Sequence, residues 1–153
     1  MALMKRSTLI SLLLGLSLLG LADAWYLAET AMTGGELACD INGLNGCNIV
    51  ATSPYAHLWG VPLGVYGVVF YALFLLISLV AFYKPSRKID GALALLGTVG
   101  LLASIAFLYI QLALIKALCI YCVGSAVIAF LLAAAAAKLY HKAKQAPEAA
   151  SVA

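Results

Sequence analysis

The chain has 153 residues, of which 65% are hydrophobic and only 10% are charged, with a formal net charge of +3 at pH 7. Soluble domains carry about 25% charged residues, so this composition excludes an ordinary soluble domain and predicts an integral membrane protein in a lipid bilayer. The basic residues are too few and too scattered to form a nucleic-acid-binding surface, and we expect no nucleic-acid partner.

The first apolar run, residues 8–28, has about the 20 residues that a membrane-spanning helix needs. Its basic start and the sequence Ala22-Asp23-Ala24 are also compatible with a cleavable secretory signal. The apolar character continues through Trp25 and Tyr26, residue types that favour the membrane–water interface, so we prefer a retained span. Asp23 is expected at that interface or facing the interior of a helix bundle.

The first long loop, residues 30–60, carries several Gly and Asn turn signals and two cysteines, Cys39 and Cys47. Within it, residues 48–59 place large apolar side chains among small polar ones. This pattern predicts a short helix on the membrane surface, interrupted at Pro54. We therefore expect the loop to form a cap over one end of the membrane domain.

Three further apolar runs predict membrane spans over about residues 61–82, 89–114 and 119–139. A basic turn at residues 83–88 and a very short link at Lys116 separate them. Residues 141–153 are Ala-rich and are expected to form a flexible cytoplasmic tail. The predicted fold class is all-α: a single four-span antiparallel bundle over residues 1–140, with an extracytoplasmic cap loop that contains a short surface helix.

The distribution of lysine and arginine predicts the orientation of these spans, because cytoplasmic loops carry an excess of both. With four spans, the basic residues before span one, between spans two and three, and after span four all fall on one side. The other side carries Lys116 together with Glu29, Glu36 and Asp40. We expect a multi-pass protein of the plasma membrane, with both termini in the cytoplasm and all four cysteines outside it.

A C-x-x-C pair, Cys119 and Cys122, stands at the head of the last span. Two thiols three residues apart lie on one helix face, and a helix N-terminus makes a nearby thiol more acidic. With Cys39 and Cys47 they form two pairs on the side where disulfides persist. A four-thiolate zinc site or two purely structural pairs are the alternatives; the wide spacing of the loop pair argues against zinc, and we expect no metal site.

Two thiol pairs at one membrane face can exchange disulfides through mixed-disulfide intermediates. The loop pair can meet a soluble thiol protein, while the C-x-x-C pair at the membrane edge can meet an acceptor dissolved in the bilayer. A quinone is the obvious acceptor, because it fits an apolar pocket between helices. The chain has no nucleotide, flavin or haem motif.

The order and spacing of these residues resemble one known family. Cys39 and Cys47 lie eight positions apart, Ser53 follows six residues after Cys47, a Gly/Pro-opened span comes next, and the C-x-x-C begins the last span. In this arrangement the chain resembles the vitamin K epoxide reductase family, in its stand-alone prokaryotic form, over roughly residues 8–139. The resemblance implies an enzyme, a quinone-reducing thiol oxidoreductase that supports disulfide bond formation.

The resemblance also implies a role for each cysteine. Cys119 and Cys122 match the active-site pair, in which Cys122 faces the quinone and Cys119 exchanges with the loop. Cys39 and Cys47 match the shuttle cysteines that take electrons from a thioredoxin-fold partner, here a separate protein on the extracytoplasmic side. Which loop cysteine bridges to Cys119 stays open.

The implied electron acceptor is a quinone of the menaquinone, ubiquinone or phylloquinone type. Six residues are expected around its pocket: Ser53, Tyr55, Trp59, Leu63, Gln111 and Tyr121. Leu63 stands where some members have a quinone-binding Asn, and Ala126 stands where vertebrate members have a Tyr, so quinone reduction is favoured over epoxide reduction. The aromatic residues could equally be interface anchors, and Gln111 could serve helix packing.

Two other functions fit parts of this pattern. A tetraspan protein whose disulfides only brace its external face would have unreactive disulfides, whereas the enzyme would have reducible pairs that exchange with each other. A second family of quinone-linked thiol oxidases also has four spans and two pairs. Its C-x-x-C lies in the first external loop, the reverse of the order found here.

Overall fold

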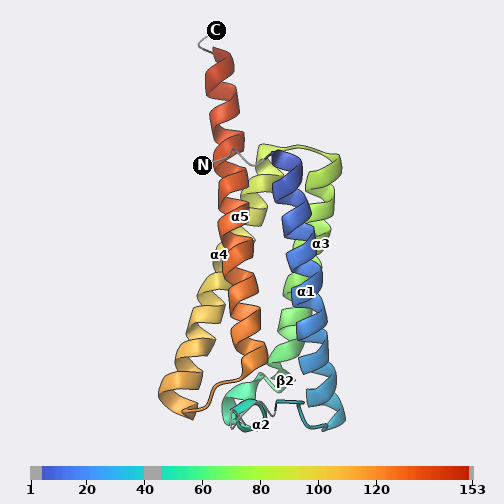
Figure 1. Ribbon diagram of the computed structural model, residues 1–153, viewed down its shortest axis with the longest axis vertical. Helices are drawn as coiled ribbons and strands as arrows, with labels where there is room; N and C mark the ends of the chain where they lie inside the picture. Colours follow the sequence, from blue (N-terminus) through green and yellow to red (C-terminus); the bar gives the residue numbers. More distant parts are fainter. Residues whose placement is uncertain (1–4, 40–45, 152–153) are drawn as a thin grey trace.

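The computed structural model describes residues 5–39 and 46–151, with the side chains of these residues placed up to Gln145. Four of its helices are long and apolar enough to cross a membrane. They run up and down alternately, so that the two ends of the chain leave the bundle at the same side (Figure 1). The predicted fold class, an all-α bundle of four membrane helices, is confirmed.

The long helices are α1 (Arg6–Thr33), α3 (Leu63–Tyr83), α4 (Arg87–Tyr109), which continues as the π-helix η2 (Ile110–Ile115), and α5 (Ile120–Ser151). Helix α1 packs against α3 and α5, and α4 packs mainly against α5. Helices α1 and α3 come close together at Gly64, where a Cβ atom would lie 2.5 Å from the backbone nitrogen of Ala28. A residue without a side chain is therefore required at this crossing.

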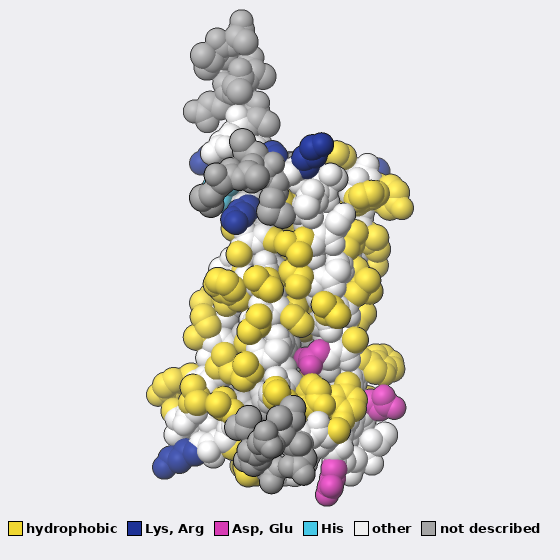
Figure 2. Space-filling view, viewed as in Figure 1, with side chains coloured by type: hydrophobic (Ala, Val, Ile, Leu, Met, Phe, Trp, Pro, Cys, Tyr) yellow, Lys and Arg dark blue, Asp and Glu magenta, His cyan; other side chains and the backbone are white. Residues whose placement is uncertain are grey.

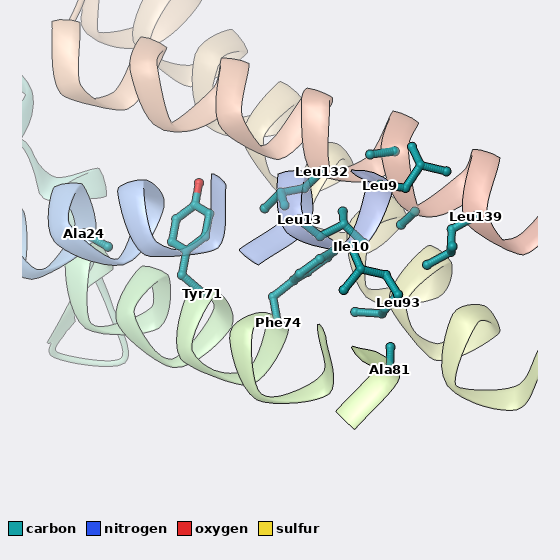
Figure 3. Packing of buried hydrophobic residues seen from close by; sticks show 12 residues of the cluster. Leu9, Ile10, Leu13, Ala24, Tyr71, Phe74, Ala81, Leu93, Leu132 and Leu139 are labelled. Carbon is teal, nitrogen blue, oxygen red and sulfur yellow. The ribbon is translucent and has the colours of Figure 1, made fainter. Parts of the chain in front are cut away.

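Near the start of α1, the interior of the bundle is a closely packed apolar core (Figure 3). Each long helix contributes at least one side chain that is 0% exposed, such as Leu13, Phe74, Leu93 and Leu132. Within a bilayer, helices gain little from removing apolar surface from water, so close packing holds such a core together.

An ion pair closes the same end of the bundle, which we call the Arg6 end. The Arg6 guanidinium donates to both carboxylate oxygens of Asp90, at 2.6 and 3.0 Å. Asp90 is 0% exposed, and the bidentate contact with Arg6 offsets the free-energy cost of removing its carboxylate from water. The pair joins the first turns of α1 and α4, which are 84 residues apart in the sequence.

At the opposite end, which we call the cysteine end, the cap consists of short pieces: α2 (Gly46–Ala51), the 3-10 turn η1 (Pro54–Ala56), β1 (His57–Leu58) and β2 (Val61–Pro62). A break before Pro54 is confirmed, but the helix predicted over residues 48–59 covers only residues 46–51 and, as a 3-10 turn, residues 54–56. The antiparallel hairpin of β1 and β2 was not predicted. Its two turn residues, Trp59 and Gly60, have φ values of 52° and 81°, the left-handed region that suits a two-residue hairpin turn.

Two helix ends differ from the prediction. Helix α1 runs past residue 28 to Thr33 and ends where Gly34 turns left-handed and its N–H caps the Thr30 carbonyl. Helix α5 continues to Ser151, through most of the tail predicted as flexible. The Ala, Lys and Gln residues there are strong helix formers, so the helix continues beyond its apolar stretch. That this segment lies in the cytoplasm stays a prediction.

Candidate active site

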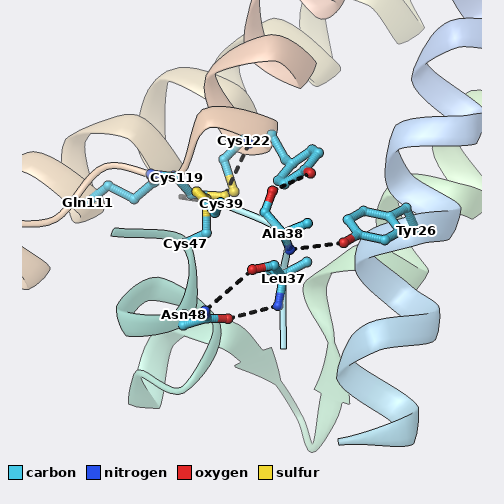
Figure 4. Close-up of a disulfide and its surroundings, with 10 residues drawn as sticks. Tyr26, Leu37, Ala38, Cys39, Cys47, Asn48, Gln111, Cys119 and Cys122 are labelled. Atoms are coloured by element: carbon cyan, nitrogen blue, oxygen red, sulfur yellow. Dashed lines mark hydrogen bonds between the residues drawn. A yellow bond between two sulfur atoms is a disulfide. The ribbon is translucent and has the colours of Figure 1, made fainter. Parts of the chain in front are cut away.

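The cap carries a disulfide between Cys39 and Cys47, whose Cα atoms are 5.9 Å apart. Cys47 lies in the first turn of α2, while Cys39 lies on the extended segment that follows α1. Asn48 ties these two segments together: its side-chain oxygen accepts the Leu37 N–H at 2.9 Å, and its amide nitrogen donates to the Leu37 carbonyl (Figure 4). The loop pair is thus held in a defined position and is buried.

The second pair lies at the start of α5. Cys119 immediately precedes the helix, and its sulfur accepts the backbone N–H of Cys122 at 3.4 Å, as a helix-capping side chain does. The Cys119 N–H in turn donates to the side-chain oxygen of Gln111 at 2.9 Å. Both cysteines are thiols. The link of residues 116–119 is therefore anchored at Gln111, and the first thiol is fixed at the helix N-terminus.

This geometry makes Cys119 the more acidic of the two thiols of the C-x-x-C pair. A hydrogen bond from the Cys122 thiol lowers the pKa of Cys119 to about 7; burial opposes this shift, and the backbone N–H groups of Cys122 and Tyr121 reinforce it. A thiolate rather than a thiol attacks disulfides. Cys119 is therefore suited to be the exchanging member of the pair near neutral pH.

The two pairs meet in one buried cluster. Cys39, Cys47 and Cys119 pack together with Leu37, and Cys122 packs against the cluster from the α5 side (Figure 4). Gly46 makes this approach possible, because a Cβ atom there would overlap the carbonyl group of Leu118. The loop disulfide thus lies against the residue that carries the acidic thiol.

Two tyrosines hold the extended segment beside Cys39. The Tyr121 hydroxyl donates to the Ala38 carbonyl at 2.8 Å, and the Tyr26 hydroxyl accepts the Ala38 N–H at 3.1 Å. Their rings lie 5.1 Å apart, centre to centre. Tyr121, expected at the quinone pocket, is instead part of this clamp on the loop, because its position between the two cysteines turns it toward the cap.

A cavity of about 270 Å³ opens beside the second pair, between the long helices and below the cap. Its lining is mostly apolar and includes Cys122 but not Cys119. The six residues expected at a quinone pocket divide: Ser53, Tyr55, Leu63 and Gln111 line the cavity, whereas Trp59 and Tyr121 do not. Trp59 is 89% exposed because it occupies the tip of the hairpin turn.

The alternative of a zinc site depends on four free thiols, and two of the four are joined in the loop disulfide. Over residues 5–39 and 46–151, no group of three or more His, Cys, Asp or Glu side chains is arranged to hold a metal ion. What the arrangement offers chemically is a disulfide, an acidic thiol beside it, and a second thiol that faces an apolar cavity.

Comparison with known proteins identifies the family of the chain. A model of the Vitamin K epoxide reductase family matches residues 11–137. The chain belongs to this family. It is also 36% identical over 115 residues to the thiol-disulfide oxidoreductase LTO1 of Arabidopsis thaliana, a match that covers 71% of this chain and 30% of the relative. The chain thus spans less than a third of the length of that curated relative. The family resemblance inferred from the cysteines and Ser53 is confirmed.

The sequence of this vitamin K epoxide reductase family member does not point to several residues of the site. Its pattern indicates Asn48, which orders the loop, only as the start of a surface helix, and Tyr26 only as an interface residue. Tyr71 and Ser125 line the cavity together with Cys122. A signal for Tyr71 existed: it lies on the helix face of Gly64, seven residues earlier, and that face packs against α1.

Proposed function

We propose that the chain is a membrane thiol-disulfide oxidoreductase that passes electrons from a thiol protein through its two cysteine pairs to a quinone. One observation carries the proposal. The loop disulfide packs against Cys119, while Cys122 of the same C-x-x-C pair faces an apolar cavity inside the bundle. A pair placed in this way can exchange with a disulfide on one side and react with a lipid-soluble molecule on the other.

The first step takes place at the cap. A thiolate of the partner attacks the Cys39–Cys47 disulfide, and its second thiol resolves the mixed disulfide, so that the partner is oxidised and the loop pair is reduced. A separate protein with a thioredoxin fold is the partner class we propose. The loop disulfide is covered by the two tyrosines, so the partner has to displace this cover or approach past Ala38.

The second step is internal. A loop thiolate attacks the Cys119 sulfur of the oxidised C-x-x-C pair and expels the Cys122 thiolate, which forms a mixed disulfide between the loop and Cys119. The second loop thiolate then attacks the loop sulfur of this mixed disulfide and expels the Cys119 thiolate, so that the loop disulfide reforms and the C-x-x-C pair is reduced. The capping geometry stabilises the Cys119 thiolate as the leaving group of this exchange, since low thiol pKa favours departure. The reduced pair then holds two electrons and two protons, with one of its thiols at the cavity.

The lining of the cavity fits a quinone. Its apolar walls suit a ring, and its polar groups are few and local, as in small-molecule sites in general. Gln111 accepts the Cys119 N–H through its oxygen, while its NH₂ group interacts with the Cys122 side chain. An NH₂ group has two donor protons, so one of them can be given to a carbonyl oxygen in the cavity. Leu63, Tyr55 and Ser53 would form the side of the site beneath the cap. A bound quinone would supply the two-electron acceptor for the thiol pair.

The charge distribution supports placing the cysteine end outside the cytoplasm. In this view, Lys and Arg side chains gather at the Arg6 end, a single basic side chain lies at the cysteine end, and acidic side chains lie toward the cysteine end (Figure 2). Positive charge favours the cytoplasmic side of a membrane. We therefore propose a plasma-membrane protein with cytoplasmic termini and with both cysteine pairs on the extracytoplasmic side, where the thiol partner would be found.

The test is quinone reduction by the purified protein in detergent, with a reduced thioredoxin-fold protein as donor. Wild type and Cys122→Ala are compared, with Val123→Ala as the matched control at the next position of α5. We expect turnover in wild type and the control, and none above background in Cys122→Ala. Undiminished turnover by Cys122→Ala would contradict the proposal.

The same preparation tests the structural alternative. If both pairs of the wild type resist a reduced thioredoxin-fold donor and dithiothreitol, and no quinone is reduced, the disulfides only brace the external face. If the loop pair is reduced but the C-x-x-C pair never exchanges with it, the proposed internal step is wrong.

A further inference from the structure

A row of three polar side chains leads from α1 through α5 to α3 beside the cavity, and the electron path described above does not use it. Asp23 of α1 lies beside Ser125 of α5 and interacts with its side chain. The Ser125 hydroxyl lies 2.8 Å from the Tyr71 hydroxyl of α3, which also approaches the Ser125 carbonyl at 2.9 Å. The second carboxyl oxygen of Asp23 is buried and has no hydrogen-bond partner among the residues that the structure describes.

Such a row is costly to keep inside a membrane helix bundle. An ionisable side chain within a span is rare and marks a ligand or proton pathway more often than a packing contact. Asp23 lies well inside α1, a candidate span. An apolar side chain at this position could pack against the neighbouring helices equally well, so helix packing does not explain the presence of a carboxyl group here.

The row of polar side chains ends at the cavity. Tyr71 and Ser125 both line it, as does Cys122, which lies three residues before Ser125 and therefore on the same face of α5. The Tyr71 ring is held firmly, because it packs over Gly20 of α1, where a Cβ atom would lie 2.6 Å from its Cζ atom. A hydroxyl group is thus fixed at the cavity wall near the thiol.

The row of three side chains can exist in two states that differ by one proton. Serine and tyrosine each have one hydroxyl proton, and a carboxyl group has either one or none. When Asp23 is protonated, it donates to Ser125, Ser125 donates to Tyr71, and the Tyr71 proton is left to be given to the Ser125 carbonyl or to a group in the cavity. When Asp23 is ionised, Ser125 donates to it and Tyr71 donates back to Ser125. The two states differ by one proton, which the row can deliver to the cavity.

We propose that Asp23, Ser125 and Tyr71 relay a proton to a carbonyl oxygen of the quinone, with Tyr71 as the immediate donor; this inference rests on the proposed function. Ser125 and Asp23 act through Tyr71 and are its positioning and resupply groups. The ligand class is a carbonyl oxygen that becomes a hydroxyl, as reduction of a quinone requires.

The balance of the reaction closes without another reagent. Cys119 and Cys122 lose two electrons and two protons and form a disulfide, and the acceptor gains two electrons and two protons. Cys122, at the cavity, gives one proton directly. Tyr71 gives the other and takes a proton from Ser125, which takes one from Asp23. The second thiol proton returns to Asp23, which interacts electrostatically with both cysteines.

The experiment uses the full chain in detergent, with its thiols reduced beforehand and menadione added by rapid mixing. Asp23→Asn, Ser125→Ala and Tyr71→Phe are compared with Ser78→Ala, which removes a buried hydroxyl from α3 outside the cavity lining. A positioned proton donor contributes about 100-fold or more to rate. We expect losses of about that size in Tyr71→Phe and Asp23→Asn, loss of the solvent deuterium isotope effect, partial rescue by Asp23→Glu, and an unchanged rate in Ser78→Ala.

A second readout needs no quinone and no turnover. The infrared spectrum of the quinone-free protein should contain a carboxylic acid C=O band that disappears in Asp23→Asn and moves in Ser125→Ala. Wild-type rate and isotope effect in Asp23→Asn, with that protein folded, would overturn the relay alone. If menadione does not oxidise the thiols of the wild type at all, the proposed function fails and the relay with it.

Discussion

The two ends of the bundle differ in how closely their helices are packed. At the Arg6 end, the helices meet through side chains such as Leu13 and Phe74 that are 0% exposed, and the buried Asp90 is neutralised by Arg6. At the cysteine end, α1 and α3 stay close at Gly64, but a cavity of about 270 Å³ opens between the helices, and the cap with its disulfide covers it. Close packing at one end lets the other end remain open without loss of the fold.

This contrast also separates the kinds of polar contact. The Arg6–Asp90 pair connects two helix starts and faces no reactive group. The polar contacts at the cysteine end, by contrast, run through backbone groups beside the thiols: Gln111 to Cys119, and Tyr121 to Ala38. We therefore expect substitutions at the Arg6 end to change stability, and substitutions at the cysteine end to change reactivity.

The largest expected effect is on stability at the Arg6 end. Arg6→Ala leaves Asp90 buried without its partner, and breaking a buried pair in this way costs about 3–5 kcal/mol. Lys88→Ala, which removes an exposed charge nearby, is the matched control and should cost under about 0.5 kcal/mol. Thermal unfolding in detergent measures both. Equal melting temperatures for the two variants would show that the ion pair does not hold this end together.

The next effect is on exchange between the two pairs. Gly46→Ala places a Cβ atom against the Leu118 carbonyl and pushes the loop disulfide away from Cys119. A misplacement of about 1 Å lowers a reaction rate about 100-fold. We expect a loss of that size in the rate of disulfide exchange between the two pairs, measured by thiol trapping and mass spectrometry. Gly124→Ala, where a Cβ atom meets nothing within 4 Å, is the control. Unchanged exchange in Gly46→Ala would mean that the loop reaches Cys119 by another route.

The acidity of Cys119 gives a pH-dependent prediction. Its pKa is lowered to about 7, so its thiolate forms as pH rises through 7, two units below the ordinary thiol value of 9.0. Alkylation of Cys119 by iodoacetamide in the reduced protein should therefore be half-maximal near pH 7. Cys122→Ala removes the largest cause of the shift and should move the midpoint upward. A midpoint that stays near 7 in that variant would assign the shift to the backbone N–H groups instead.

The smallest effect is expected at the tyrosine clamp. Tyr121→Phe removes one hydrogen bond to Ala38, worth about 1 kcal/mol. The loop should open more often, and the rate of Cys39–Cys47 reduction by dithiothreitol should rise about fivefold, the rate equivalent of that energy. Tyr109→Phe, an exposed tyrosine on α4, should leave the rate unchanged. A rate equal to wild type in Tyr121→Phe would mean that the clamp does not limit access.

Much of the site could be predicted because its chemistry is local. Cys119 and Cys122 are three residues apart at the head of an apolar run, and Ser53 comes before a Gly/Pro-opened span, so spacing within short stretches indicated the family. The family resemblance then pointed to four of the residues that line the cavity. The placement of Trp59 and Tyr121 could not be read in this way. One depends on a left-handed hairpin turn, and the other on which side of the α5 N-terminus the loop occupies.

The amino-acid sequence by itself determined the four spans and the two cysteine pairs, because apolar length and residue spacing are properties of short stretches. The family resemblance implied that Cys122 faces the acceptor and Cys119 the loop, and the tertiary structure has Cys122 in the cavity lining and Cys119 beside the loop disulfide. Only the tertiary structure decided that Asp23, Ser125 and Tyr71 form one row of polar side chains. These residues come from three helices far apart in the sequence, and the packing of α1, α3 and α5 sets their contacts.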